Sequence, residues 1–189
     1  MCGVSQLSRW HRGAYVGKFQ PFHKGHLECV KYVLERVDEL VIVLGSSQYS
    51  HSLENPFTAG ERIEMIRLAL MEAGIPCERY VIVPVPDTNC VHALWVAHVI
   101  SYTPKFEVVF SNEPLTRRLF YEAGFEVQSI PFFNRDVLSA TEVRQRMIRG
   151  ENWEELVPRS VAEYIKSING VERLRSLVQK DKPPFKAQL

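Results

Sequence analysis

Two histidines three residues apart, His23 and His26, stand in the stretch GKFQPFHKGH at residues 17–26. A short apolar run precedes this stretch, and an apolar pattern of helical spacing follows it. A strand, a glycine-containing turn and a helix N-terminus in this order form a phosphate cradle, because free backbone N–H groups and the positive end of the helix dipole meet there. Gly25 permits a close backbone approach or a positive φ. We predict that both imidazoles donate hydrogen bonds to phosphoryl oxygens beside Lys18.

Two other interpretations of the histidine pair stay open. One is a metal site, although no carboxylate or cysteine stands near the pair at a familiar ligand spacing. The other is that one histidine only caps the helix or packs beneath the loop. Phosphate contact is favoured because the histidines together follow a strand and stand near a lysine.

A second stretch, LSATEVRQRM at residues 138–147, has the spacing of another helix start. Ser139 is placed to be the N-cap, so backbone N–H groups and the Thr141 hydroxyl would face a ligand at the helix N-terminus. Arg144 lies three residues after Thr141 on the same helical face, within reach of a triphosphate held there. The alternative is an ordinary capping box of Ser139 and Glu142, followed by a solvated basic face.

Apolar runs and capping signals predict strands that alternate with helices. We expect strands near residues 13–16, 39–44, 80–83, 107–110 and 126–130. We expect helices from 24 with an apolar stripe reaching 37, and near 58–74, 91–101, 114–124 and 139–149, with further helical stripes beyond 150. In the third helix, the residues placed inward are Ala93, Val96, Ala97 and Ile100. The predicted fold class is α/β, a Rossmann-like doubly wound five-stranded parallel sheet with helices on both faces and a C-terminal helical segment.

Polar residues follow each of the predicted strands. Parallel sheets bind ligands outside the carboxyl ends of their strands, at the topological switch point, so the loops that follow the strands share one rim. That rim carries His23, Ser46, Asp87, Ser111 and Ser139. We expect these side chains to gather at one end of the fold.

A chain of 189 residues most simply forms a single domain. We divide it into an α/β core over 12–149, C-terminal helices over 150–179, and flexible ends at 1–11 and 180–189. The net charge of +1 gives no support to an extended nucleic-acid surface, and no apolar run is long enough to span a bilayer. We therefore expect neither a nucleic-acid nor a membrane partner.

The four cysteines, Cys2, Cys29, Cys77 and Cys90, form no C-x-x-C pair and no zinc spacing. A disulfide between Cys77 and Cys90 stays open, although nothing in the sequence requires one. The chain does not open on a basic segment followed by an apolar core. We expect a cytoplasmic protein with reduced thiols.

The two predicted phosphate sites share one rim without a Walker sequence or a G-x-G-x-x-G motif. No Ser-His-Asp or Cys-His arrangement supplies an obvious nucleophile. The simplest chemistry is an in-line displacement between two bound phosphate groups, catalysed by positioning and charge neutralisation.

These stretches also carry a family resemblance. GKFQPFHKGH with LSATEVRQRM resembles the nucleotidylyltransferase superfamily, whose motifs are H-x-G-H and a later S-x-T-x-x-R. More closely, SSQYSHSLENPFTAGER, HALWVAHV, FSNEPLTRRLF and NGVERLRSL resemble archaeal-type nicotinamide-nucleotide adenylyltransferases. The resemblance runs from about Gly13 to Leu177, so it is not confined to one motif.

The resemblance implies the reaction of ATP with nicotinamide mononucleotide (NMN) to give NAD and pyrophosphate, a step of NAD biosynthesis. The 5′-phosphate of NMN would attack the α-phosphorus of ATP without a covalent enzyme intermediate. Mg²⁺ would be held by substrate phosphates, with no metal ligands from the protein. The resemblance also implies a homo-oligomer, often a hexamer in this family.

For the ATP side, the resemblance implies that His23 and His26 contact phosphates and that His26 stabilises the transition state. Lys18 stands where relatives often carry arginine, and it would hold phosphate as a point charge. Arg144 would act with Ser139 and Thr141 on the β and γ phosphates, and the implied catalytic residues are His23, His26, Lys18 and Arg144. The remaining implied ATP-binding positions are Gly17, Phe19, Gly25, Ser111 and Asn112.

For the NMN side, Trp95 matches a tryptophan that stacks near the nicotinamide ring. Its alternative is a core position in the third helix. Asp87 and Asn89 would reach the nicotinamide amide or a ribose, although Asp-Thr-Asn is also an ordinary turn. Ser46 and Ser47 would contact the dinucleotide from the loop after the second strand.

The chain departs from the family pattern at several places. The segment from Asp87 to Trp95 is one residue longer, and His92 stands where asparagine usually precedes Ala-Leu-Trp. Glu54 takes a place that is often basic, and Asn112 with Glu113 replaces the more usual Gly-Asn. These differences bear on NMN-site geometry and on adenine or ribose contacts, and they leave the two phosphate motifs intact.

Other functions remain as alternatives. One is a different enzyme of the superfamily, acting on pantetheine phosphate or FMN, against which the Trp95 region and the segment 57–62 argue. Another is a non-catalytic nucleotide-binding sensor, which would be expected to carry a damaged H-x-G-H or S-x-T-x-x-R. The sequence does not decide between NMN and its deamidated analogue.

Overall fold

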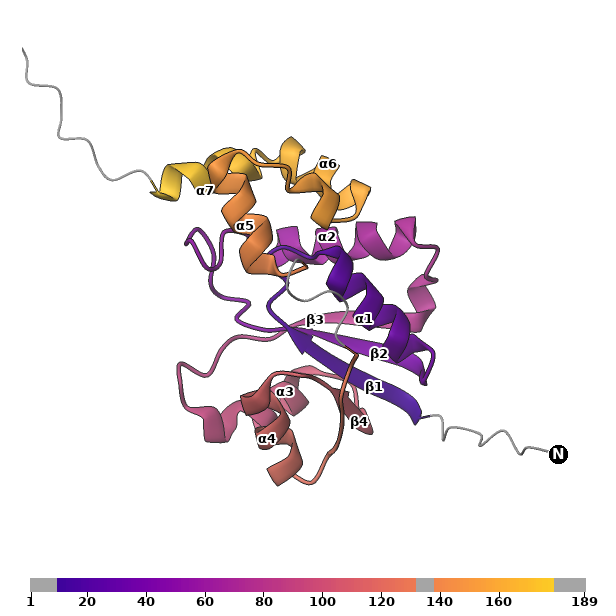
Figure 1. Cartoon of the computed structure of the whole chain (residues 1–189). Coiled ribbons are helices and arrows are strands. Elements are labelled where there is room, and N and C mark those ends of the chain that lie inside the picture. Colours follow the sequence, from indigo (N-terminus) through magenta and orange to yellow (C-terminus); the bar gives the residue numbers. More distant parts are fainter. Residues whose placement is uncertain (1–9, 132–137, 179–189) are drawn as a thin grey trace, which may run out of the picture.

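The computed structural model describes residues 10–131 and 138–178, and within them the chain forms one parallel sheet covered on both faces (Figure 1). The strand order is β3-β2-β1-β4-β5, and every neighbouring pair runs parallel. The strands are β1 (Trp10–Gly17), β2 (Val37–Leu44), β3 (Tyr80–Pro84), β4 (Val108–Phe110) and β5 (Glu126–Gln128). The order reverses between β1 and β4, so the switch point lies outside the carboxyl ends of these two strands.

Helices cover the two faces unequally. The α-helices are α1 (Lys24–Leu34), α2 (Ala59–Glu72), α3 (Trp95–Tyr102), α4 (Pro114–Glu122), α5 (Ala140–Arg149), α6 (Arg159–Ser167) and α7 (Gly170–Val178). In Figure 1, α3 and α4 lie below the sheet, and the other helices lie above it. This is the doubly wound arrangement that the sequence predicts.

The central strand β2 shows why the chain folds in this way. Its residues Leu40, Ile42 and Leu44 belong to the core that contains α1, α2 and α5–α7 side chains. Val41 and Val43 belong to the core on the α3 and α4 side. Alternate side chains of a strand point to opposite faces, so an unbroken apolar run fits a strand that is buried on both sides.

Most predicted elements are confirmed, with three corrections. Val37 is the first residue of β2 rather than the end of the first helix stripe. The third helix begins at Trp95 after a short 3₁₀ turn (His92–Leu94) and buries Val96 and Val99, whereas the other residues predicted to point inward, Ala93, Ala97 and Ile100, are exposed. Trp10 and His11 are part of β1, although the sequence suggested a flexible lead through residue 11.

The caps of α2 and α5 differ in the structure. Thr58 and Glu61, which have the spacing of a capping box, form a reciprocal one at the start of α2. Ser139 caps α5 by accepting a hydrogen bond from the Glu142 N–H. The Glu142 carboxylate pairs with Arg146 instead of returning to the Ser139 N–H, so this box is only half formed.

The C-terminal helices fasten the start of α2. Arg173 of α7 donates to both carboxylate oxygens of Glu61, at 2.7 and 2.8 Å, and to the Pro56 carbonyl at 3.3 Å.

Cys77 and Cys90 are both free, so the disulfide left open by the sequence does not form. No helix within the described part of the chain has the length and apolarity needed to cross a bilayer. The division into a single domain with flexible ends stays a prediction, since residues 1–9 and 179–189 lie outside the described residues.

Candidate active site

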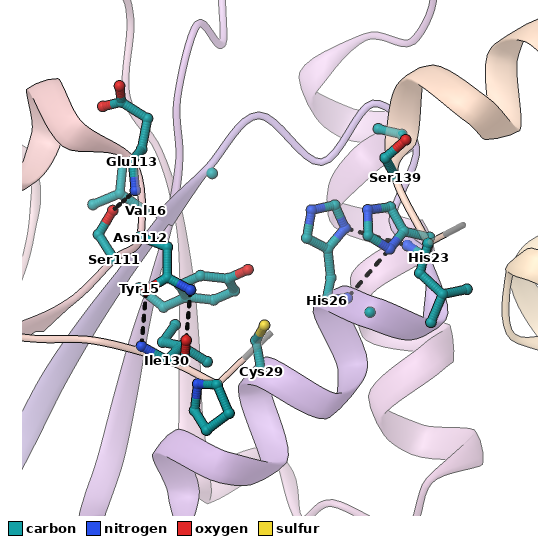
Figure 2. Close-up of a pocket in the computed structure, with 15 residues that line it drawn as sticks. Tyr15, Val16, His23, His26, Cys29, Ser111, Asn112, Glu113, Ile130 and Ser139 are labelled. Atoms are coloured by element: carbon teal, nitrogen blue, oxygen red, sulfur yellow. Dashed lines mark hydrogen bonds between the residues drawn. The ribbon is translucent and has the colours of Figure 1, made fainter. Parts of the chain in front are cut away.

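The histidine pair caps its own helix. His23 is the N-cap of α1, and its Nδ1 accepts a hydrogen bond from the His26 N–H at 3.3 Å. In return, the Nδ1 of His26 accepts from the His23 N–H, also at 3.3 Å. Figure 2 draws these two hydrogen bonds as dashed lines. The two rings stack with centroids 3.6 Å apart. The H-x-G-H motif is therefore a capping box built from imidazoles.

This arrangement defines which ring nitrogen carries the proton. In a neutral imidazole one nitrogen accepts and the other carries N–H, so two accepting Nδ1 atoms leave Nε2–H as the donor of each ring. Burial lowers the pKa of His23 to about 4. Burial and the neighbouring His23 lower the pKa of His26 well below its ordinary value. At neutral pH the pair presents two uncharged N–H donors.

Aromatic packing supports His26 from behind. The Phe19 ring lies edge-on to His26 with centroids 4.9 Å apart, and the Phe22 centroid lies 5.5 Å from the same ring. A Cβ on Gly17 would lie 2.7 Å from the Phe19 ring, and a Cβ on Gly25 would lie 3.0 Å from the His23 ring. Of the two possibilities for Gly25, close approach is the one that applies, since its φ is not positive. Both glycines make room for rings.

A first cavity of about 290 Å³ opens in front of the pair. Figure 2 shows His23, His26 and Ser139 on one side of it, and Ser111, Asn112 and Glu113 on the other. Apolar and weakly polar groups complete the lining, among them Tyr15, Cys29, Ile130 and Leu138. The cavity lies at the ends of β1 and β4, where the topology places the switch point.

The far wall of this cavity is held by its own hydrogen bonds. Asn112 donates from Nδ2 to the Ile130 carbonyl at 2.6 Å and accepts at Oδ1 from the Ile130 N–H at 3.0 Å. Ser111 is buried, and its Oγ accepts from the Glu113 N–H at 3.1 Å. Asn112 thus fixes the segment that follows β5, because its side-chain amide forms a pair of hydrogen bonds with the backbone of Ile130.

A second cavity of about 570 Å³ adjoins the first, since both are lined by His26 and Ala140. It carries the cationic side chains Lys18 and Arg144, together with Thr141 at the N-terminus of α5. The first N–H groups of a helix have no intrahelical partners and attract anions. The histidines present neutral donors to the first cavity, which also has the acidic Glu113 in its lining, and the cationic Lys18 and Arg144 line the second.

Arg144 is oriented by protein contacts. Its Nη1 donates to the Gln20 carbonyl at 2.7 Å, and its Nη2 donates to the Thr141 hydroxyl at 3.3 Å. Burial lowers the pKa of Arg144, and the nearby Glu54 carboxylate acts in the opposite direction. Glu54 also lines the second cavity, so one carboxylate faces the cationic wall.

The loops after β2 and β3 are joined by a group of hydrogen bonds. The Ser46 hydroxyl donates to the Asp87 carboxylate at 3.1 Å, and the Gln48 side chain bonds both the N–H and the carbonyl of Asp87. Tyr49 donates from its hydroxyl to Asn89 Oδ1 at 2.6 Å. We call these five residues the loop clasp: Ser46, Gln48, Tyr49, Asp87 and Asn89.

Comparisons with known proteins decide the family. A model of the cytidylyltransferase-like family matches residues 14–146. A nicotinamide-nucleotide adenylyltransferase of Pyrococcus furiosus is 55% identical over 167 residues, covering 88% of each chain. One of Saccharolobus solfataricus is 52% identical over 171 residues, covering 90% of this chain and 99% of the relative. The chain belongs to the nicotinamide-nucleotide adenylyltransferase family.

Solved structures agree on the fold. A bifunctional NMN adenylyltransferase/ADP ribose pyrophosphatase of Francisella tularensis, complexed with AMP and a manganese ion, matches with a TM-score of 0.76 at 23% identity. The alignment covers 88% of this chain and 52% of that one, so this chain spans about half the length of the bifunctional protein. At this identity the likeness concerns the fold alone, and it agrees with the doubly wound sheet described above.

The structure brings the predicted ATP-side residues together. The first cavity is lined by Gly17, His23, Gly25, His26, Ser111, Asn112 and Ser139. The second is lined by Lys18, Phe19, His26, Thr141 and Arg144. Phe19 is only 1% exposed, so its ring supports His26 from the core. Their contacts with ATP stay predictions.

The predicted NMN-side residues form a separate group within the described chain. Ser46, Ser47, Asp87, Asn89 and Trp95 line neither of the two cavities. Trp95 is half-buried in the core below the sheet, and its ring end lies 3.8 Å from the position of a Cβ on Gly45. The core position and the stacking role are compatible, because the ring reaches the end of β2 from that core.

Sequence reasoning missed three supporting groups of residues. Gln20 bonds both backbone groups of Phe57, at 2.9 and 3.0 Å, and so ties the cradle loop to the segment before α2. Gln48 and Tyr49 complete the loop clasp by bonding Asp87 and Asn89. Arg62 is a fully buried arginine. The one available signal was positional, since Arg62 interrupts an otherwise apolar helix face.

Proposed function

We propose that this protein is a nicotinamide-nucleotide adenylyltransferase, which transfers the adenylyl group of ATP to NMN and releases pyrophosphate. The observation that carries the proposal is the pair of helix N-termini, α1 and α5, opening onto adjoining cavities that share His26. The relatives that bear this name match over 88% or more of both chains. Together, site and family favour NMN over the other acceptors of the superfamily.

In this mechanism an oxygen of the NMN 5′-phosphate attacks the α-phosphorus of ATP in line. The new P–O bond forms while the bond from the α-phosphorus to the bridging oxygen breaks, and pyrophosphate leaves with that oxygen. The Nε2–H groups of His23 and His26 would donate to phosphoryl oxygens, and His26 would stabilise the charge that builds on them. Such donors stabilise the transition state because they are held in place before the reaction.

The cationic wall would hold the leaving group. Arg144 presents a planar fork already oriented by Gln20 and Thr141, which suits a phosphate. Lys18, in the same cavity, would add a point charge, and Ser139 and Thr141 would add contacts at the α5 N-terminus. The first cavity, with Gly17, Ser111 and Asn112, would take the adenosine part beside its apolar floor.

On the acceptor side, we propose that the loop clasp and Trp95 receive NMN. Trp95 would stack on the cationic nicotinamide ring. Asp87 and Asn89 would contact the amide or the ribose, with Ser46 and Ser47 next to them. The clasp supports this assignment because its hydrogen bonds fix two loops at the rim of the sheet.

We propose Mg²⁺ as the divalent ion, bound mainly through substrate phosphates. The described residues contain no group of three or more His, Cys, Asp or Glu side chains placed to hold a metal ion. Bound with the triphosphate, the ion would neutralise phosphate charge and orient the leaving group. A manganese ion accompanies AMP in the Francisella tularensis structure, so either ion is worth testing.

Four further predictions belong to this proposal. We expect a homo-oligomer, with a hexamer as the first form to test by light scattering. We expect a cytoplasmic location, and we expect no nucleic-acid or membrane partner. We expect residues 1–189 to act as one catalytic domain.

The proposal is tested by incubating the protein with ATP, Mg²⁺ or Mn²⁺, and one acceptor at a time. The acceptors are NMN, nicotinic acid mononucleotide, FMN and pantetheine phosphate, and the products are pyrophosphate and the dinucleotide. We expect NAD from NMN, and the deamidated acceptor measures the pyridine preference. Pyrophosphate release only with FMN or pantetheine phosphate would establish the alternative enzymes. ATP binding without any product would establish the sensor.

A further inference from the structure

Arg62 of α2 is the largest fully buried side chain of the described residues, with 0% exposure. None of the ion pairs among these residues includes it, so no carboxylate neutralises its charge there. Burial lowers the pKa of Arg62 to about 10, which leaves the guanidinium charged at neutral pH. A buried charge needs compensation, because its removal from water is costly.

Backbone carbonyls supply that compensation. The Nη1 of Arg62 donates to the Lys18 carbonyl at 2.8 Å and to the Gly45 carbonyl at 3.0 Å. Its Nη2 donates to the Ser46 carbonyl at 3.2 Å, and its Nε to the Thr58 carbonyl at 3.3 Å. Lys18 belongs to the loop after β1, and Gly45 and Ser46 belong to the loop after β2. A single guanidinium therefore joins the phosphate cradle at residues 17–26 to the loop clasp.

The residues next to these carbonyls have unusual backbones. Phe19 follows Lys18 and has φ of 52°, and Ser46 follows Gly45 and has φ of 50°. Non-glycine residues pay a conformational cost in this left-handed region, and they stay there only when their surroundings hold them. Arg62 donates a hydrogen bond to the carbonyl that precedes each of these two residues. Arg62 is thus a contact that both turns share, beside the hydrogen bond from the Gly45 N–H to the Gly17 carbonyl at 2.9 Å.

The same hydrogen bonds set the direction of the N–H groups that follow the bonded carbonyls. A trans peptide unit carries its C=O and its N–H on opposite sides, so carbonyls held toward α2 turn the following N–H groups away from it. The Ser47 N–H follows this rule and donates to the Val85 carbonyl at 3.2 Å. Among the described residues, the N–H groups of Phe19 and Ser46 have no acceptor. Backbone N–H groups of such loops that have no protein acceptor attract anions.

We propose that Arg62 is a positioning residue: it sets the conformation of the loops after β1 and β2 together, so that their Phe19 and Ser46 N–H groups meet the phosphates of the two substrates. The inference rests on the proposed adenylyl transfer. Arg62 itself touches neither substrate. Its effect passes through two loops whose relative placement decides the alignment of attacking and leaving groups, and a misplacement of about 1 Å is enough to cost about 100-fold in rate.

Variants at one position test this proposal. Arg62→Lys keeps the charge but loses the fork, and Arg62→Met loses both. We expect kcat to fall about 10-fold in the lysine variant and about 100-fold in the methionine variant, with KM for both substrates raised about 5-fold or more. Arg67→Met is the matched control, because Arg67 lies on the same helix at the surface and pairs only with Glu64 among the described residues. It should stay within about 2-fold of the parent.

The pattern of constants separates positioning from folding. A purely structural role would reduce the amount of active protein and lower kcat while both KM values stay unchanged. Folded Arg62→Lys and Arg62→Met variants with parental KM values for both substrates would overturn the proposal.

A measurement on the unmodified protein covers the case in which the variants do not fold. A non-hydrolysable ATP analogue should shift the NMR signals of the Phe19 amide and slow its hydrogen exchange, and NMN should do the same at Ser46. Unchanged signals at both amides under saturation would overturn the proposal. Failure of the unmodified protein to make a dinucleotide would refute the proposed reaction instead, and these two results are distinguishable.

Discussion

The N-termini of α1 and α5 face adjoining cavities, and they differ in charge. At α1 the buried pair His23 and His26 is neutral, since burial lowers both pKa values. At α5 the guanidinium of Arg144 stands with Lys18 in the second cavity. A permanent charge already attracts the polyphosphate of the bound substrate strongly, whereas a neutral fixed donor contributes little to that binding and gains when charge builds on its acceptor. We therefore expect the α5 end to contribute mainly to substrate binding and the α1 end mainly to catalysis.

The largest predicted effect comes from removing a neutral histidine donor at the N-terminus of α1. His26→Ala should lower kcat by about 100- to 1,000-fold, the cost of removing one fixed transition-state donor, while KM for NMN changes little. Steady-state kinetics at saturating ATP measures both constants. His11→Ala is the control, because that histidine is exposed on β1 and pairs with Asp38. Equal turnover in the His26→Ala variant would remove His26 from the mechanism.

A substitution at the α5 end, where Arg144 is charged, should affect KM for ATP more than kcat. Arg144→Met is expected to raise KM for ATP by about 10- to 100-fold, the value of a lost charge-assisted pair, with a smaller fall in kcat. Arg149→Met on the same helix is the matched control, since Arg149 is exposed and pairs with Glu151. If Arg144→Met lowered kcat as strongly as His26→Ala and left KM unchanged, the division between the two helix ends would be wrong.

In the absence of ligand, acidic pH should lower the free energy of unfolding through protonation of His23. The pKa of His23 is lower in the folded protein than in the unfolded chain, so the unfolded chain binds more protons between about pH 6.5 and 4. The free energy of unfolding is thus undiminished above this window and falls as the pH decreases through it. Between pH 7 and pH 5 the His23 contribution is about 2 kcal/mol.

The matched variant for this prediction is His23→Asn, because asparagine also caps helices and does not titrate. Urea denaturation at pH 7 and pH 5 should show a smaller loss of unfolding free energy in the variant than in the parent. Equal losses in the two proteins would show that His23 is not the group that titrates.

The smallest predicted effect concerns the carboxylate at the cationic end. Glu54 is exposed and faces Arg144, so it opposes the binding of phosphate. Glu54→Gln should lower KM for ATP by about 2- to 3-fold at low salt, and the gain should shrink at high salt because exposed charges are screened. Glu78→Gln, an exposed acid far along the chain from the cavities, serves as the control. A raised KM would mean that Glu54 assists the nucleotide instead.

Local signals in the sequence were sufficient for the fold class and for the two helix starts. Both phosphate motifs lie at N-caps, and caps are read from neighbouring residues. The apolar run of β2 indicated a strand buried on both faces. The exposed face of α3 was misplaced because a 3₁₀ turn precedes Trp95 and shifts the helical phase, which an apolar count does not detect.

The supporting contacts of the site are tertiary, and for that reason local patterns did not reveal them. Arg62 is buried because carbonyls from two distant loops surround it, and its sequence neighbours say nothing about those carbonyls. Gln48 and Asp87 pair across two loops that no periodicity places side by side. The sequence offers capping by a histidine only as an alternative to phosphate contact, whereas in the structure the rings cap through Nδ1 and keep Nε2–H as a donor.

The protonation of the histidine pair tests the account most directly. Nitrogen-detected NMR of the ring signals in the ligand-free protein reports both the charge and the tautomer of His23 and His26. We predict two neutral rings at pH 7, each with its proton on Nε2, and titration of His23 near pH 4. A charged ring at pH 7, or a proton on Nδ1 of either ring, would contradict the distinction between a neutral catalytic end and a cationic binding end.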